Sequence, residues 1–386
     1  MNQQQTSLLK SKWLLDDDIK YLNHGSFGAR TECIRSAQQY YRDLLECSPV
    51  DFLDRKSAKF LKRSREALAQ FLSLDSSGFG FVDNATTGIS VAIHSLDLSV
   101  GDEILSTNHV YNGVRQLLIK RARDVGCSYR ELDVPFPSPS SSDLASIIIN
   151  ELSPNVKVLV VDHISSATSL IFPINELISA CKERGVFIII DGAHAPGMLP
   201  FDGWNHFPDW YIGNLHKWVC APLGAAFVWS SESRRSQTHP LTISHFLDQS
   251  YIEEFDWQGT KDISPWLTVY DAISRLTAEE WSVQMKNNHA LAIDFEQAWL
   301  DEFELNSMYA DTNQIGSIVT VRLPIEGIST IEEANAFRDS LSDEHLLEIP
   351  VFMFENALYT RFSAQEYVKR DWIAQFIEVI KTKKES

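Results

Sequence analysis

The fold is decided by residues 186–229, VFIIIDGAHAPGMLPFDGWNHFPDWYIGNLHKWVCAPLGAAFVW. The stretch opens with Val186–Ile190, an apolar and mostly β-branched run whose length is typical of a buried strand. Asp191 therefore stands at the carboxyl end of a strand, which is where open α/β sheets place their ligand sites. A second short strand, Trp210–Ile212, comes next, and Lys217 lies in the loop that follows it.

A carboxylate at one strand end and a lysine in the next loop are the two groups that pyridoxal 5′-phosphate (PLP) chemistry requires. The lysine forms a Schiff base, and the carboxylate keeps the pyridine nitrogen protonated so that the ring can accept electrons. Taken alone, Asp191 could cap a helix and Lys217 could be an exposed surface lysine. Its neighbours His216 and Trp218, and the small residues beyond them, favour a desolvated lysine with a lowered pKa. PLP chemistry is therefore the working hypothesis.

The composition is that of an ordinary globular protein, with 386 residues, of which 44% are hydrophobic and 22% charged. This length suffices for two domains and a large core. The formal net charge of −18 argues against nucleic acid or an anionic membrane as the main partner. The five cysteines are scattered without a CxxC pair, so we expect no disulfide framework and no metal site. With no secretory signal and no apolar run long enough to span a bilayer, a cytoplasmic setting is expected.

Strands and helices alternate over residues 103–190, and this βαβ alternation predicts a mostly parallel sheet covered by helices. The alternation ends after residue 229. Residues 266–303 are expected to be helical, and residues 317–381 form a compact α+β unit. The predicted fold is therefore α/β, with a large domain over 31–265 and a smaller domain built from 1–30, which starts loosely over 1–20, and 266–386. The expected strands are 79–82, 103–107, 128–134, 156–161, 186–190, 317–323, 348–354 and 358–362, and the main expected helices are 31–47, 52–73, 113–125, 144–152, 173–184, 330–340 and 365–381.

Polar residues follow several of these strands. TNHVYN ends at Asn112 and contains His109 and Tyr111, and Asp162 begins DHISSAT. Because the carboxyl ends of parallel strands meet at one edge of a sheet, we expect these residues to share a site with Lys217. His109 or Tyr111 could stack on a pyridine ring, although a lone histidine is as often a satisfied structural residue.

Two further segments have the composition of binding loops, and one arginine is a candidate binding residue. Residues 84–88, NATTG, lead into the helical pattern Ile89–Leu96, where hydroxyls and backbone N–H groups bind anions or simply cap the helix. Residues 23–28, NHGSFG, form a glycine loop that can approach a ligand closely. Arg361 lies within a strand, where an arginine is costly unless paired. A bidentate clamp for a substrate carboxylate explains it, and a structural salt bridge is the competing account.

Together these motifs resemble the class V branch of the fold-type I PLP-dependent enzymes, and most closely the isopenicillin N epimerase-like group, a relative of the cysteine desulfurases. The resemblance covers residue 21 to about residue 370, with the motifs in the family's order. It implies the fold-type I architecture: a large domain with a mostly parallel mixed sheet between helices, and a smaller α+β domain. The motifs that carry it are NHGSFG, NATTGIS, TNHVYN, DHISSAT, DGAHAPG, GNLHKW, QGT and RFSAQEY, of which DGAHAPG and GNLHKW are the most specific.

The resemblance also implies roles for single residues. Lys217 would carry the Schiff base, Asp191 would bind the pyridine nitrogen, His194 would lie near the phenolic oxygen of PLP, and His109 would stack on the ring. Arg361 would bind the α-carboxylate of an amino-acid substrate. The phosphate would be held by Thr86, Thr87, Gly88, Asn214 and His216, and the substrate pocket would be lined by Asn23, His24, Ser26 and Tyr111. The pair Gly259-Thr260 would complete the neighbouring subunit's phosphate site, so a homodimer is implied.

The expected function is a PLP-dependent enzyme acting at Cα of an amino acid, of the epimerase or racemase type. The alternative is a C–S β-lyase acting on cysteine or on a cysteine conjugate or sulfoxide, followed by an aminotransferase. Epimerisation needs a second acid, for which His109 and Tyr111 are the candidates. Persulfide-forming desulfurase chemistry is not expected, because residues 340–361 contain no cysteine. A PLP carrier without turnover is disfavoured, since it would not need Arg361.

Overall fold

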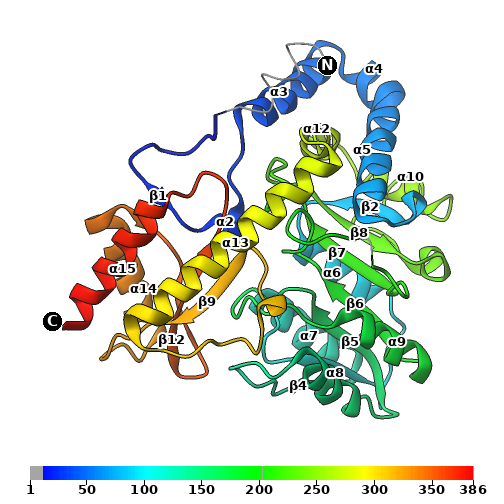
Figure 1. Ribbon diagram of the computed structural model, residues 1–386. Coiled ribbons are helices and arrows are strands. Elements are labelled where there is room, and N and C mark those ends of the chain that lie inside the picture. Colours follow the sequence, from blue (N-terminus) through cyan, green and yellow to red (C-terminus); the bar gives the residue numbers. More distant parts are fainter. Residues whose placement is uncertain (1–11, 202, 386) are drawn as a thin grey trace.

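The computed structural model describes residues 12–201 and 203–385 (Figure 1). Residues 1–11 lie outside the described part. They include the first half of the loose start expected over 1–20 and most of the N-terminal sequence in which no secretory signal is expected.

Within the described residues, the central sheet has seven strands in the order β2-β8-β7-β6-β5-β3-β4. Only β8 runs antiparallel to its neighbours, and the pairs from β7 to β4 are parallel. The predicted mostly parallel mixed sheet is therefore confirmed. The strands are β2 (Phe79–Val82), β3 (Glu103–Thr107), β4 (Ser128–Leu132), β5 (Val156–Asp162), β6 (Phe187–Asp191), β7 (Trp210–Asn214) and β8 (Ala226–Ser230).

Alternate residues of the sheet enter two separate cores. In β5, Val158 and Val160 belong to one core, and Leu159 and Val161 to the other. This follows from the two-residue period of a strand, and it explains why the strand sequences are continuously apolar: both faces are covered by helices. These helices are α6 (Ala85–His94) and α7 (Asn112–Val125) in one core, and α8 (Ser141–Asn150) and α9 (Ile174–Arg184) in the other.

Helix α6 begins at Ala85, four residues before the expected Ile89. Asn84 provides the reason, because its side-chain Oδ1 accepts a hydrogen bond from the Thr87 backbone N–H at 2.8 Å and so caps the helix. The correction brings Ala85 and Thr86 into the first turn of the helix, at the carboxyl edge of the sheet.

The second unit is built on three antiparallel strands in the order β11-β12-β9 (Figure 1). The short strand β1 (Lys20–Tyr21) pairs with β10 (Leu347–Glu348), so this part of the N-terminal segment lies with the C-terminal unit. This pairing supports the proposed assignment of residues 1–30 to the smaller domain. The remaining elements are β9 (Ile318–Arg322), α14 (Ile331–His345), β11 (Val351–Phe354), β12 (Ala357–Ser363), α2 (His24–Phe27) and α15 (Arg370–Glu385).

The helical stretch expected over 266–303 is three helices, α11 (Ser264–Leu267), α12 (Val269–Ser274) and α13 (Ala278–Phe303). Thr277 and Glu280 form a capping box at the N-terminus of α13, so α13 begins as a separate helix. Helices α11 and α12 pack against α3 (Glu32–Cys47) and α5 (Ser57–Leu72) of the large unit, whereas α13 packs against β9 and α15. We therefore propose that the domain boundary lies near residue 275, after α12, and not at 265.

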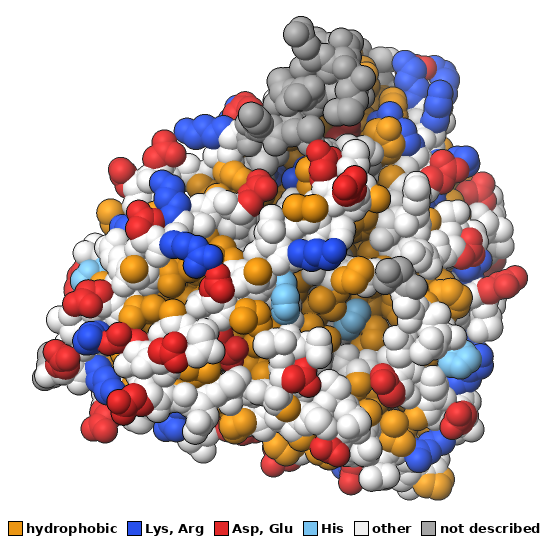
Figure 2. Space-filling model, in the orientation of Figure 1, with side chains coloured by type: hydrophobic (Ala, Val, Ile, Leu, Met, Phe, Trp, Pro, Cys, Tyr) orange, Lys and Arg blue, Asp and Glu red, His pale blue; other side chains and the backbone are white. Residues whose placement is uncertain are grey.

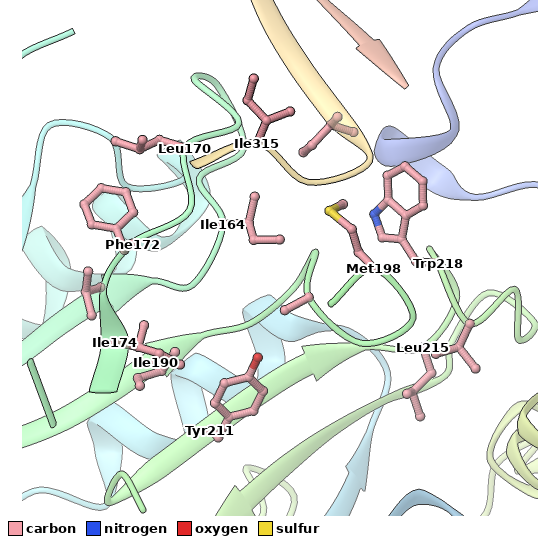
Figure 3. Packing of buried hydrophobic residues seen from close by; sticks show 14 of the residues in the cluster. Ile164, Leu170, Phe172, Ile174, Ile190, Met198, Tyr211, Leu215, Trp218 and Ile315 are labelled. Carbon is pink, nitrogen blue, oxygen red and sulfur yellow. The ribbon is translucent and has the colours of Figure 1, made fainter. Parts of the chain in front are cut away.

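The two units share a packed core. Ile315 precedes β9, and it lies beside Ile164 and near Met198 from the large unit (Figure 3). A Cβ added at Gly316 would collide with the sulfur of Met198, so a larger residue here would force the methionine side chain to shift. The packing fixes how residues on β12 face the carboxyl edge of the central sheet.

Acidic and basic side chains are interspersed over the face shown in Figure 2, without a continuous basic area there. Among the described helices, none combines the length and the apolar character needed to cross a membrane.

Candidate active site

The candidate site lies where strands β5, β6 and β7 end. Asp162 and Asp191 are paired in register as the last residues of neighbouring parallel strands, and Asn214 ends β7. The loop after β7 carries Lys217. The expected gathering of polar groups at this edge is therefore observed.

These residues line a cavity of about 300 Å³, which we call the cofactor pocket. It lies between the strand ends, the start of α6, the α2 segment and β12. Its lining comprises Gly25, Ser26, Phe27, Asn84, Ala85, Thr86, Tyr111, Asp162, Ser166, Asp191, Ala193, His194, Asn214, His216, Lys217 and Arg361. Nine of the residues given a role from the sequence thus meet in one pocket, brought there by six separate segments of the chain.

Lys217 has the environment of a nucleophilic lysine. Burial and the nearby Arg361 charge lower its pKa to about 7, although Asp191 and Asp162 act in the opposite direction. Its Nζ lies 3.1 Å from His194 Nε2. At neutral pH the Lys217 amine is therefore unprotonated in a large fraction of the molecules, and attack on a carbonyl carbon requires this form.

Asp191 and Asp162 form a pair of buried carboxyl groups. Burial raises the pKa of both, and the Asp191 charge raises the pKa of Asp162 further. A backbone bond from Ala193 N–H to Asp191 Oδ1, at 3.0 Å, and the Lys217 charge lower the pKa of Asp191. The rise is larger at Asp162, so Asp191 is the more acidic member of the pair. The sequence placed Asp162 at this edge of the sheet but indicated no role for it.

His194 and His216 both line the pocket and are neutral there. Burial lowers the pKa of His194 well below its ordinary value and lowers that of His216 to about 4, and the Lys217 charge adds to both effects. His216 Nδ1 lies 3.2 Å from the Ala225 carbonyl oxygen, whereas His194 Nδ1 is buried with no protein partner. The two imidazoles can therefore donate or accept hydrogen bonds without adding charge.

The predicted phosphate residues divide into two groups. Thr86, Asn214 and His216 line the pocket beside the N-terminus of the ten-residue helix α6. Asn214 Oδ1 accepts a bond from Ala85 N–H at 2.8 Å, which ties this helix start to β7. Thr87 bonds to the capping Asn84, and Gly88 packs against Ile212, so neither lines the pocket. Asn84 and Ala85 do line it, although the sequence indicated no individual role for them.

Thr260 is exposed and does not line the cofactor pocket of its own chain. Its predicted role in the site of a second subunit therefore stays a prediction.

Arg361 reaches the pocket from β12 and is buried, with 5% of its surface exposed. Its Nη1 donates to the Ser166 carbonyl at 2.5 Å, and its Nη2 donates to Ser26 Oγ at 2.9 Å, while Nε has no partner. No carboxylate in the described part of the chain forms an ion pair with it. Burial lowers its pKa to about 10, so it is a cation at neutral pH. A buried arginine without an anion favours the carboxylate clamp over the structural salt bridge.

Of the NHGSFG residues expected to line the substrate pocket, Ser26 does so, whereas Asn23 and His24 do not. Ser26 lines the pocket, but Asn23 stands behind it, where Asn23 Oδ1 accepts from Ser26 Oγ at 2.5 Å. His24 is fully buried outside the pocket lining, and its Nε2 lies 3.2 Å from the Lys217 carbonyl oxygen. Asn23 and His24 thus hold Ser26 and Lys217 in place instead of facing a substrate.

His109 is not brought into the cofactor pocket. Its Nδ1 lies 2.5 Å from Thr168 Oγ1, its Nε2 lies 3.0 Å from the Val134 carbonyl oxygen, and its ring packs among aromatic side chains. Tyr111, with 48% of its surface exposed, lines the pocket instead. This arrangement does not support stacking by His109, and it makes Tyr111 the candidate ring.

The pocket fits PLP. A carboxyl group at a strand end, an amine with a pKa near 7 and a helix N-terminus with hydroxyl and amide groups match a pyridine nitrogen, an aldehyde and a phosphate. Asp162 Oδ2 and His194 Nδ1 are buried polar atoms without partners. Buried polar atoms normally have partners, and bound PLP would supply polar groups to this pocket.

Comparison with known proteins gives the family. The profile described as aminotransferase class V matches residues 22–338. The chain is 28% identical to a putative L-cysteine desulfhydrase of Oryza sativa subsp. japonica over 371 residues, 91% of this chain and 76% of that protein. It is 28% identical to an isopenicillin N epimerase of Streptomyces clavuligerus over 280 residues, 68% of this chain and 70% of that protein.

The fold agrees with solved structures. A cysteine desulfurase from Thermococcus onnurineus NA1 superposes with a TM-score of 0.79 at 16% identity, covering 98% of this chain and 97% of that chain. The expected α/β fold, the family and the cofactor are thereby confirmed. The chain belongs to the class V aminotransferase family, whose cofactor is pyridoxal 5′-phosphate.

Proposed function

We propose that this protein is a PLP-dependent C–S β-lyase that acts on an amino acid with sulfur at Cβ. The observation that carries the proposal is Lys217, a buried amine in the cofactor pocket whose pKa of about 7 suits a base at Cα. The pKa values of His194 and His216 are lowered, so neither imidazole is a cation at neutral pH that could serve as the second acid. Elimination needs one base at Cα, whereas epimerisation needs a second acid on the other face.

Each pocket residue has a part in this reaction. Arg361 binds the substrate carboxylate, and Ser26 and Ser166 hold the guanidinium in position. When bound, PLP supplies the electron sink for the pair left at Cα. Lys217 Nζ accepts the Cα proton, and Asp191 holds a proton on the pyridine nitrogen.

The reaction balances with water alone. The Cα–H bond and the Cβ–S bond break, and sulfur leaves with the electron pair and takes a proton. The three-carbon enamine that remains is hydrolysed. An S-substituted cysteine and one water thus give one thiol, one pyruvate and one ammonium ion. No oxidant or reductant is needed, and neither is the persulfide-carrying cysteine that residues 340–361 lack.

The test is product stoichiometry. We expect purified protein with PLP to release thiol, pyruvate and ammonium in equal amounts from an S-substituted L-cysteine. Formation of the D-amino acid with its carbon–sulfur bond intact would contradict the proposal.

Epimerisation remains the second candidate, because Tyr111 also lines the pocket. Tyr111 follows β3 and Lys217 follows β7, and β5 and β6 lie between these strands in the sheet. The tyrosine and the lysine therefore enter the pocket from separate points along the edge of the sheet, and an epimerase needs two such acids. The relatives support both candidates, since a desulfhydrase and an epimerase match at the same identity.

Replacing Arg361 with alanine should raise KM for the amino acid by about 100-fold, the value of a lost bidentate charge-assisted pair. PLP binding should change little. Both are measured by steady-state kinetics and by titration of apo-protein with PLP. Arg338→Ala is the control, because Arg338 is paired with its neighbour Asp339 on the surface. Equal losses of substrate and PLP binding would instead indicate a structural role.

The rate at which PLP attaches covalently to the apo-protein should depend on pH around 7. Below the Lys217 pKa of about 7 the ammonium form prevails and cannot attack, and above it the free amine prevails. The rate should therefore rise about tenfold between pH 6 and pH 8 and then level off. Stopped-flow absorbance measures this rate, and a rise confined to pH above 9 would contradict the lowered pKa.

We further propose a homodimer in which Gly259-Thr260 helps to bind phosphate in the neighbouring subunit, and a cytoplasmic location. The dimer proposal is supported by the exposed position of Thr260 outside its own pocket and by the family resemblance. The location proposal is supported by scattered cysteines without a CxxC pair.

A further inference from the structure

A second cavity of about 330 Å³, which we call the distal pocket, adjoins the cofactor pocket. The two share Tyr111, Ser166 and Arg361 in their linings. A molecule whose carboxylate binds Arg361 can therefore extend from one pocket into the other. A cavity of this size lies in the range that accommodates small ligands.

One wall of the distal pocket is apolar. It consists of Pro350 and the consecutive residues Phe352, Met353 and Phe354 of β11, the edge strand of its sheet. All three strand residues are half-buried, and Ala167 stands among the other lining residues. A run of half-exposed apolar side chains beside a catalytic pocket is typical of a ligand-binding surface.

The polar residues Asn108 and Arg115 on the other side of the distal pocket already have hydrogen-bond or ion-pair partners within the protein. Arg115 Nε donates to Glu131 at 2.5 Å, and its Nη2 donates to the Asn108 carbonyl at 2.9 Å. The Asn108 side-chain amide donates to Glu355 at 2.6 Å and to Asp133 at 2.9 Å. Since Arg361 is already assigned to the α-carboxylate, a charged substituent would find no unpaired partner here. An uncharged apolar group suits the distal pocket.

We propose that the distal pocket binds the substituent on the sulfur of the substrate, so that the preferred substrates are S-alkyl or S-aryl cysteines and not free cysteine. This inference rests on the proposed C–S lyase function. Cysteine ends at its sulfhydryl group and would leave the distal pocket to water. An S-benzyl or S-butyl group would bury apolar surface against Phe352, Met353 and Phe354, which stabilises the bound state.

The experiment compares L-cysteine, S-methyl-, S-butyl- and S-benzyl-L-cysteine in the PLP-loaded protein, by pyruvate release and by Cα–H exchange in D₂O. For elimination, kcat/KM should rise at least tenfold from S-methyl to S-benzyl, mainly through KM. Ala167→Leu fills the pocket and should abolish this gain. The Ala167 carbonyl oxygen, which accepts a bond from Thr320 at 2.7 Å, is unaffected by the change. Ala278→Leu, at an exposed position on α13, is the matched control and should keep the gain.

A second variant tests the same proposal independently, in case Ala167→Leu does not fold. Met353→Ala removes part of the apolar wall from a half-exposed edge strand, and it should raise KM for S-benzylcysteine more than for S-methylcysteine. Pyruvate release that is fastest with free cysteine would contradict the proposed role of the distal pocket but not the lyase function. The same holds if the rise in kcat/KM from S-methyl- to S-benzylcysteine persists in Ala167→Leu. If Cα–H exchange becomes faster with longer side chains but no pyruvate forms, the lyase function is wrong, whereas the proposal that the distal pocket binds the substituent on sulfur still holds.

Discussion

Changing Lys217 to alanine is expected to lower kcat/KM by about ten-thousand-fold or more, because one side chain is both the covalent attachment point of PLP and the base at Cα. The variant should also fail to retain PLP covalently. Borohydride reduction followed by peptide mass spectrometry should place the phosphopyridoxyl group on Lys217 in the unchanged protein and nowhere in the variant.

Lys286→Ala is the matched control for this change. Lys286 is exposed on α13 and does not line the cofactor pocket, so both activity and covalent labelling should be unchanged. Labelling of the Lys217→Ala variant at the normal level would assign the attachment to another lysine and would remove the basis of the proposed mechanism.

Changing Asp191 to asparagine is expected to lower kcat by about 10²- to 10³-fold, the typical loss when one preorganised electrostatic group is removed. Asparagine is nearly isosteric, and its Oδ1 can still accept the Ala193 backbone bond. The variant should therefore fold, bind PLP and lack only the charge that keeps the pyridine nitrogen protonated. Kinetics and the absorption spectrum of the loaded protein measure both effects.

Asp162→Asn is the informative comparison, because Asp162 ends the neighbouring strand in register with Asp191. If Asp162 carries the proton of the pair, an amide imitates its neutral form and the loss should stay under roughly tenfold. Equal losses in the two variants would mean that the charge is shared between the carboxyl groups and is not localised on Asp191.

Much of the fold was predictable from the sequence because its signals are local. The apolar runs of β5 and β6 are buried on both faces, and the polar residues after them mark the edge where parallel strands end. The helix starts were less certain, since a residue such as Asn84 reads equally as a loop residue or as a cap.

The site was predictable at the level of segments but not of single side chains. His109 and Tyr111 stand two residues apart, and which of them faces the pocket depends on the turn between β3 and α7 and on the aromatic residues that enclose His109. Ser26 and His24 are separated in the same way by the short helix α2. The distal pocket had no sequence signal, because it exists only where β11 faces the loops that follow β3 and β5.

The central claim, that a single base at Lys217 leads to elimination, is tested most directly by proton NMR in D₂O. The protein with PLP is incubated with S-benzyl-L-cysteine, and the substrate remaining at partial conversion is examined on a chiral column. The account predicts pyruvate and thiol as products and remaining substrate that is still the L-enantiomer, whether or not its Cα carries deuterium. Accumulation of the deuterated D-enantiomer, with its carbon–sulfur bond intact, would contradict the account and establish a two-acid epimerase.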